Sequence, residues 1–204
     1  MGQRNFVLIC VGGIPVIGKT LLARALAVRL NFDTVSTDAI RRIIRSVTSA
    51  KKFPGVHFFV GERAELYLPK TPVPTVLKHY FAEARDVWKG IQPLIRDFEP
   101  AKQYGLIIEG VAILPEIVHR LCQPKKCPVH IKPIFLIAPD KETISRNLKK
   151  RGLWAETPEL QKIELEYLWA LNEKIRVTAE RLGFRTVPCA PYQTLVRRVM
   201  KLLR

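Results

Sequence analysis

Apolar residues in this chain form short continuous runs, and segments of helical period separate one run from the next. The runs have the length and the β-branched content of buried strands and lie at about residues 6–11, 33–37, 105–109, 131–138 and 184–188. Segments with apolar residues every three or four positions lie at about 21–30, 39–47, 75–98, 113–122, 140–152, 157–182 and 192–204. This alternation predicts an α/β fold with a five-stranded parallel sheet flanked by helices.

The pattern is weakest at residues 48–75, where proline, glycine and lysine clusters predict a loop with a short helix inside it. A connection of this length is typical of a binding segment. In the long helix that follows, Gly90 and Pro93 are expected to introduce a kink or a split. In the helix before it, the apolar positions 40, 43, 44 and 47 predict one buried face.

The clearest chemical signal lies between the first strand and the first helix, where two glycines are separated by four residues and followed by lysine and threonine. Such a loop presents backbone N–H groups and a helix N-terminus to phosphates, while the lysine reaches the β- and γ-phosphates and the threonine hydroxyl binds Mg²⁺. We therefore expect ATP and Mg²⁺ as cofactors. The expected cofactor-binding residues here are Gly13, Ile14, Pro15, Val16, Ile17, Gly18, Lys19, Thr20 and Leu21.

Two carboxylates end predicted strands on the same edge of the sheet. Asp38 follows the second strand and occupies the predicted N-cap of the next helix, so it can cap that helix, face a ligand, or do both. Glu109 ends the buried strand at 105–109, and an apolar strand followed by an acid is the pattern that orients magnesium-bound water beside a phosphate loop. Thr20 and Glu109 are thus the predicted metal-site residues.

A cluster of cations closes the helix at 140–152. Arg146 and Arg151 flank two lysines there, close to the predicted C-terminus of the helix. Two interpretations stay open. The cations can simply complement the helix dipole, or they can hold the phosphates during transfer as part of a lid.

The charge balance of 34 Lys and Arg against 18 Asp and Glu gives a formal net charge of +16. Such a charge attracts polyanions, and nucleic acid is one of them. However, the cations are spread along the sequence without an aromatic-interleaved basic tract or a known nucleic-acid motif. This favours a small anionic substrate over a nucleic-acid partner.

Composition also limits the cellular context. No apolar run approaches the ~20 residues that a membrane helix needs, and no signal peptide is expected before the first strand. The four cysteines lack metal-type spacing, and Cys10 and Cys189 lie in apolar runs typical of buried thiols. A cytoplasmic protein is expected, and the scarcity of Asn and Gln beside abundant Arg, Lys, Glu and Ile indicates a thermophilic source.

Beyond the phosphate loop, the stretches Val35–Arg41 (VSTDAIR) and Ile107–Val111 (IIEGV) resemble the 2-phosphoglycerate kinase family and its archaeal relatives. That family is part of the larger group of nucleoside-monophosphate-kinase-like P-loop kinases, which includes shikimate and gluconate kinases and the zeta-type toxins. The similarity runs from residue 6 to the C-terminus. It implies one P-loop kinase domain over 1–204, with a helical substrate-binding region at about 39–104 and a lid at about 146–158.

The resemblance also implies roles for individual residues. The residues expected to contact the acceptor are Asp38, which would hold or deprotonate its hydroxyl, and Arg41, which would bind an anionic group. Glu109 would act near magnesium and the acceptor. Lys19, Asp38, Arg146 and Arg151 form the expected catalytic set, and Pro191, in the turn at 189–192, would border the adenine.

Two departures from the family bear on the substrate. The interior of the phosphate loop is apolar, and the segment Phe58–Arg63 (FFVGER) stands where the serine-rich substrate segment of 2-phosphoglycerate kinases is expected. An archaeal branch that resembles this family phosphorylates mevalonate 3-phosphate at its 5-hydroxyl, in isoprenoid biosynthesis by a mevalonate pathway. A branched acceptor suits a more apolar pocket, so 2-phosphoglycerate and mevalonate 3-phosphate both stay open.

Three other functions also stay open at this point. The first is a kinase or NTPase acting on nucleic acid, and the second is a nucleoside or nucleotide kinase, because the same scaffold serves many acceptors. The third is a nucleotide-dependent switch or binding module, although the guanine-recognition pattern Asn-Lys-x-Asp is absent from the sequence.

Overall fold

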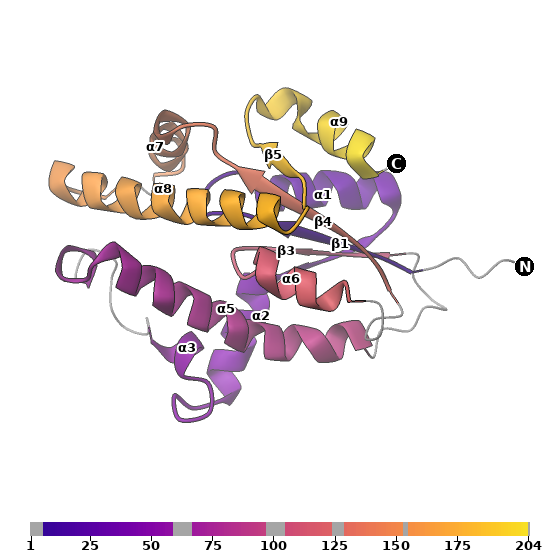
Figure 1. The fold of residues 1–204 in the computed structure, drawn as a ribbon, viewed down its shortest axis with the longest axis horizontal. Coiled ribbons are helices and arrows are strands. Elements are labelled where there is room, and N and C mark those ends of the chain that lie inside the picture. Colours follow the sequence, from indigo (N-terminus) through magenta and orange to yellow (C-terminus); the bar gives the residue numbers. More distant parts are fainter. Residues whose placement is uncertain (1–5, 59–66, 97–104, 124–128, 153–154, 204) are drawn as a thin grey trace, which may run out of the picture.

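A single parallel sheet organises the protein (Figure 1). The computed structural model describes residues 6–58, 67–96, 105–123, 129–152 and 155–203. Within them the strands are β1 (Val7–Gly12), β2 (Asp33–Ser36), β3 (Gly105–Glu109), β4 (His130–Ile137) and β5 (Thr186–Pro188). They pair in the order β2-β3-β1-β4-β5, and every pairing is parallel. The predicted five-stranded parallel sheet is confirmed.

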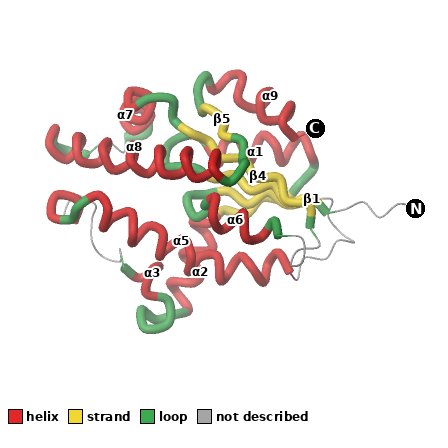
Figure 2. Tube along the Cα trace, viewed as in Figure 1, coloured by secondary structure: helices red, strands yellow, loops and turns green. Residues whose placement is uncertain are grey.

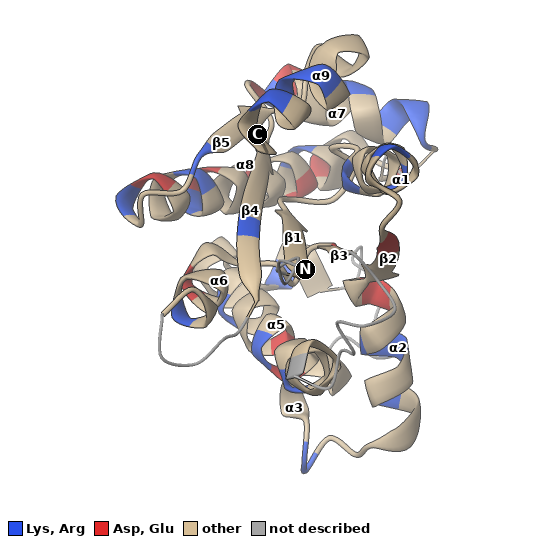
Figure 3. Cartoon of the chain, turned by 90° about the vertical axis from the view of Figure 1, so that its right-hand side faces the viewer, with Lys and Arg blue, Asp and Glu red and all other residues tan. Residues whose placement is uncertain are grey.

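Helices connect the strands and cover both faces of the sheet (Figures 2 and 3). They are α1 (Lys19–Leu30), α2 (Thr37–Val47), α3 (Pro54–His57), the 3₁₀ helix η1 (Leu68–Lys70), α5 (Val73–Arg96), α6 (Pro115–Leu121), α7 (Lys141–Lys150), α8 (Pro158–Arg181) and α9 (Tyr192–Leu203). In Figure 3, α6 and α8 lie on one side of the sheet and α1 lies on the other. Strands β1 and β3 are therefore buried on both faces, which explains why they are apolar throughout rather than alternating.

Helix α5 runs without a break through Gly90 and Pro93, so the split that these residues suggested does not occur. Gly90 instead allows α5 to pack closely against α2, because a Cβ there would lie 2.8 Å from Cδ1 of Ile44 on α2. The indole Nε1 of Trp88 donates to the carbonyl of Ala112 at 2.6 Å, and the hydroxyl of Tyr80 donates to the carbonyl of Val111 at 2.6 Å. These two bonds attach α5 to the segment that follows β3.

Helix α2 differs from its predicted packing. Ile44 is buried and Ile40 packs against the core, but Ile43 is 62 % exposed and Val47 is 74 % exposed. Among the described residues α2 packs mainly against α5, with smaller contacts to α3 and β2, and these contacts cover only part of the predicted apolar face.

The carboxyl end of β4 is joined to α8 by one buried amide. Asn172 is fully buried, its Oδ1 accepts from the backbone N–H of Ala138 at 2.8 Å, and its Nδ2 donates to the carbonyl of Ala138 at 3.1 Å. A buried polar side chain must satisfy its hydrogen bonds, so this pair fixes the register of α8 against the sheet. Thr157 caps the N-terminus of α8, where its side-chain oxygen accepts from the backbone N–H of Leu160.

Several predicted features lie outside the described residues. They are the end of the long helix at Phe98, Cys127 in the link after α6, most of the segment at 58–63, and residues 153–154 of the predicted lid. Cys10 and Cys189 are buried, as predicted. No helix among the described residues is long and apolar enough to cross a membrane.

Candidate functional site

The phosphate loop lies between β1 and α1, with a glycine at each end in a backbone conformation that favours glycine. Gly13 has φ +136°, and a Cβ there would lie 2.5 Å from the carbonyl oxygen of Leu136. Gly18 has φ +88° and is the N-cap of α1, without a side chain that caps the helix. The first N–H groups of α1 therefore have no side-chain acceptor, which suits them to bind an anion.

The apolar interior of the loop has a structural explanation. Ile14 and Ile17 are buried in the hydrophobic core at 0 % and 2 % exposure, so these side chains anchor the loop and leave its backbone for the ligand. Val16 has φ +59°, a left-handed conformation that costs a residue with a Cβ roughly 1–2 kcal/mol. Its side chain is only 8 % exposed, and burial offsets part of this strain.

Lys19 is the buried cation of the site. Its side chain is 7 % exposed, and its Nζ donates to the carbonyl of Ile14 at 2.6 Å, across the loop. Burial lowers its pKa from 10.5 to about 8, while the negative charges of Glu109 and Asp38 oppose that shift. The ammonium is thus held where phosphate oxygens would replace the carbonyl as its partner.

The two residues predicted to form a magnesium site, Thr20 and Glu109, are in contact. The Thr20 hydroxyl donates to Oε1 of Glu109 at 3.2 Å, although the two residues are 89 positions apart. Glu109 is 5 % exposed at the end of β3, while Thr20 is exposed. Hydroxyl and carboxylate oxygens are ligands that Mg²⁺ prefers, and in phosphate sites the nucleotide supplies further oxygens. No group of three His, Cys, Asp or Glu side chains forms a metal cage among the described residues.

Asp38 lies in the first turn of α2, and the prediction that it is the N-cap was wrong. The N-cap is Ser36, whose Oγ accepts from the N–H of Asp38 at 3.2 Å. Because Ser36 already caps the helix, the Asp38 carboxylate is not needed for that role. It is 50 % exposed, and its Oδ1 lies 3.4 Å from Nη2 of Arg41. A carboxylate in this position can turn toward a ligand.

Arg41 is held by the carboxylate of Glu83, a residue that the sequence did not identify as part of the site. Glu83 on α5 is 6 % exposed, and its Oε1 accepts from Nη1 of Arg41 at 3.1 Å. Arg45, one turn further along α2, places its Nη2 3.8 Å from the other oxygen of Glu83. Burial raises the pKa of Glu83, and the charge of Arg41 opposes that shift. The four-residue spacing of Arg41 and Arg45 was a signal that both cations could share one anion. The sequence around Glu83, however, contains no pattern that identifies Glu83 as that anion.

The predicted lid cations take different positions. Arg151 is the C-cap residue of α7, and its charge contributes to lowering the pKa of Lys19, which places it within electrostatic range of the phosphate loop. Arg146 lies on α7, where its Nη2 donates to the hydroxyl of Thr143 at 3.2 Å. The charge of Arg151 thus acts on Lys19, whereas the guanidinium of Arg146 contacts its own helix.

The turn after β5 lies beside the phosphate loop. Pro191, in a cis peptide bond with Ala190, precedes Tyr192 at the start of α9. A Cβ on Gly18 would lie 3.4 Å from Cε2 of Tyr192, so this turn borders the N-terminus of α1. Pro191 is thus close to the loop whose nucleotide it was predicted to border.

Comparison with known proteins supports the fold. No family model matches the sequence, and no curated protein matches it. Among solved structures, a gluconokinase from Sinorhizobium meliloti 1021 is 12 % identical, with a TM-score of 0.56 over 99 % of this chain and 93 % of that one. A shikimate kinase from Acinetobacter baumannii, in complex with shikimate, is also 12 % identical, with a TM-score of 0.55 over 98 % and 94 %.

A deoxyadenosine kinase from M. mycoides is 14 % identical, with a TM-score of 0.51 over 97 % of this chain and 98 % of that one. At such low identities the similarity concerns the fold. The protein has the α/β fold of the P-loop kinases, as the sequence predicted.

Proposed function

We propose that the protein is an ATP-dependent kinase that transfers the γ-phosphoryl group to a hydroxyl of a small, anionic, already phosphorylated hydroxy acid. One observation carries the proposal. The exposed Asp38 carboxylate lies beside Arg41 and follows the end of β2. The last residue of β2 pairs with Glu109, which in turn accepts from Thr20, the neighbour of the buried Lys19 in the phosphate loop. A proton acceptor, an anion-binding guanidinium and a phosphate-binding ammonium are thus grouped together, as phosphoryl transfer requires.

Each group has a distinct task in this reaction. The N–H groups of the loop and Lys19 bind the β- and γ-phosphates, and Arg151 adds positive charge from the end of α7. Thr20 and Glu109 would hold Mg²⁺, which neutralises phosphate charge when it is bound. Asp38 accepts the proton of the acceptor hydroxyl as its oxygen bonds to the γ-phosphorus, while the bond from that phosphorus to the β-γ bridging oxygen breaks and ADP leaves.

The acceptor's own phosphate or carboxylate would bind Arg41. Arg41 is restrained by a buried partner, so it offers a pre-organised donor rather than a mobile one. Its Nε is buried without a hydrogen-bond partner among the described residues. An anionic acceptor would supply the hydrogen-bond acceptors that the guanidinium of Arg41 lacks in the described part of the chain. The two candidate acceptors are 2-phosphoglycerate and mevalonate 3-phosphate, the latter phosphorylated at its 5-hydroxyl, and the choice between them follows from the family resemblance alone.

The test is ADP release with ATP and Mg²⁺ against a panel of acceptors. The panel contains 2-phosphoglycerate, mevalonate 3-phosphate, mevalonate, shikimate, gluconate, nucleosides and a 5′-hydroxyl oligonucleotide. We expect one phosphorylated hydroxy acid to raise ADP release far above background in the wild type, with strong loss in Asp38→Asn. Background rates across the whole panel would reject the proposal and favour a nucleotide-dependent switch.

A second candidate function is phosphorylation of nucleosides or of nucleic acid. The first is favoured by the fold similarity to a deoxyadenosine kinase, and the second by the net charge of +16. In the view of Figure 3, however, Lys and Arg are spread over several helices instead of one surface. Tight oligonucleotide binding that weakens steeply with salt would favour the nucleic-acid function.

A further inference from the structure

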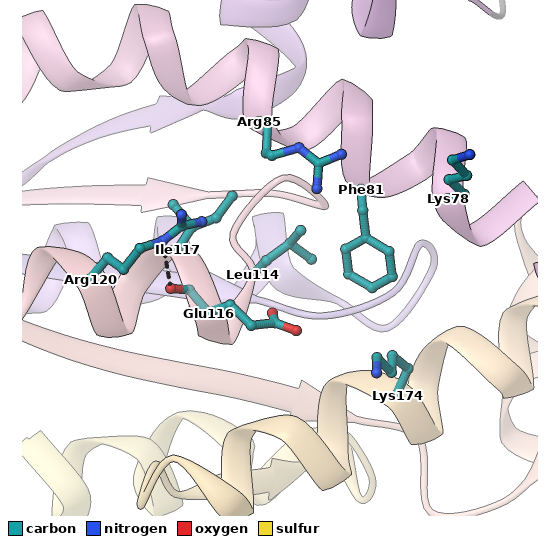
Figure 4. Close-up of a pocket in the computed structure, with 8 residues that line it drawn as sticks. All are labelled: Lys78, Phe81, Arg85, Leu114, Glu116, Ile117, Arg120 and Lys174. Atoms are coloured by element: carbon teal, nitrogen blue, oxygen red, sulfur yellow. Dashed lines mark hydrogen bonds between the residues drawn. The ribbon is translucent and has the colours of Figure 1, made fainter.

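A pocket separate from the phosphate loop opens where α5, α6 and α8 meet (Figure 4). Its volume is about 290 Å³, enough for a small metabolite. Four of the side chains that line it are cations: Lys78 and Arg85 from α5, Arg120 from α6 and Lys174 from α8. None of the residues that line it belongs to the phosphate loop, to α2 or to the ends of β2 and β3.

These four cations have no anionic partner in the part of the chain that the structure describes. Among the described residues no carboxylate lies within ion-pair distance of any of them, although Arg120 donates from Nε to the backbone carbonyl of Glu116 at 3.3 Å. Lys78, Phe81 and Arg85 are three and four residues apart, so they share one face of α5, and Glu83, which holds Arg41, points to the opposite face. Unpaired cations that line one pocket from three helices create a positive potential in it.

The pocket also has an apolar part and one acceptor. Phe81, Leu114 and Ile117 provide apolar surface, and the ring of Phe81 points into the space between the helices (Figure 4). The carboxylate of Glu116 points into the same space, and its Oε2 is buried without a hydrogen-bond partner. A buried acceptor without a donor is unfavourable, so a ligand that brings a donor would relieve that cost.

We infer that this pocket is a second binding site, and that its ligand is a small organic dianion with an apolar body and a hydrogen-bond donor. The anionic group pairs with the cations, the apolar body packs on Phe81, and the donor reaches Glu116. This inference does not rest on the proposed function, because no residue of the pocket takes part in phosphoryl transfer.

Phenyl phosphate is a suitable probe, since it combines a dianion with an apolar ring. Its binding is measured by titration calorimetry at about pH 8 and low salt, with the protein saturated by Mg²⁺ and a non-hydrolysable ATP analogue to fill the phosphate loop. We expect one molecule bound per chain, roughly tenfold or more tighter than inorganic phosphate because the ring is buried. Affinity should fall as salt rises.

Variants locate the site. Arg85→Ala combined with Lys174→Ala should weaken binding roughly hundredfold, about tenfold for each lost charge-assisted contact. The matched control removes two exposed cations of α9, with Arg197→Ala and Lys201→Ala, and should leave the affinity unchanged. Glu116→Gln should tighten binding, because phenyl phosphate has no donor for the carboxylate and only experiences its repulsion.

Three results would overturn the inference. The first is the absence of stoichiometric binding in the complex with the ATP analogue. The second is equal weakening by the α9 control, which would mean that only net charge matters. The third is loss of binding in Arg41→Ala, which would mean that phenyl phosphate binds at the proposed acceptor site. We expect the Arg41→Ala variant to bind phenyl phosphate with unchanged affinity. Failure of the proposed kinase activity would appear separately, in the ADP-release panel.

Discussion

Replacing Lys19 with methionine should change how the stability of the nucleotide-free protein depends on pH. Lys19 is 7 % exposed, and burial lowers its pKa from 10.5 to about 8. A pKa difference between the folded and unfolded states makes the free energy of unfolding depend on pH. Methionine fills similar space without a charge, so comparison of the two proteins isolates this effect.

The sign follows from the direction of the shift. Between about pH 8 and pH 10.5 the unfolded chain still holds the Lys19 proton while the folded protein has released it, so rising pH favours the folded state. The cost of burying the charge is about 3 kcal/mol at pH 7 and falls to about 1 kcal/mol at pH 9.5. The wild type should therefore gain about 2 kcal/mol of unfolding free energy relative to Lys19→Met over that interval.

Urea unfolding of both proteins at about pH 7 and pH 9.5 measures this double difference. Urea is preferred because it is uncharged and does not screen the site. Tyrosines and other groups that titrate in this range are common to both proteins and cancel. The loss of the hydrogen bond from Lys19 to Ile14 shifts the absolute stabilities but contributes little to their change with pH. A difference constant to within about 0.5 kcal/mol would refute the desolvation of Lys19.

Three further predictions concern the site and its supports. Asp38→Asn should reduce turnover roughly 10²–10⁴-fold with unchanged circular dichroism, as expected for loss of a general base; wild-type rates would remove Asp38 from the chemistry. Glu83→Gln should raise the KM for the acceptor more than it lowers kcat, because Arg41 loses its buried charged partner; an unchanged KM would contradict that positioning role. Gly13→Ala should destabilise the fold by roughly 2 kcal/mol or more and weaken nucleotide binding. Gly152 is also at positive φ but has open space around it, so Gly152→Ala should cost only about 1 kcal/mol. Equal costs for the two variants would contradict the close contact of position 13 with Leu136.

Much of the fold could be predicted because its signals are local. Buried strands between two layers of helices must be apolar along their whole length, so β1 and β3 were visible as continuous runs. The loop at residues 13–20 carries its glycines at fixed spacing, and both are at positive φ in the structure. Local chemistry misled at the start of α2, where Ser36 rather than Asp38 caps the helix, since either side chain suits an N-cap.

The amino-acid sequence by itself determined the order of strands and helices, the phosphate loop and the carboxylates at the ends of β2 and β3, because each depends on neighbours a few residues away. Tertiary structure alone decided which distant residues meet. Glu83 reaches Arg41 over 42 positions and Glu109 reaches Thr20 over 89, and the cations of the second pocket come from three separate helices. These long-range contacts depend on how whole helices pack against the sheet, and short-range sequence patterns do not specify that packing.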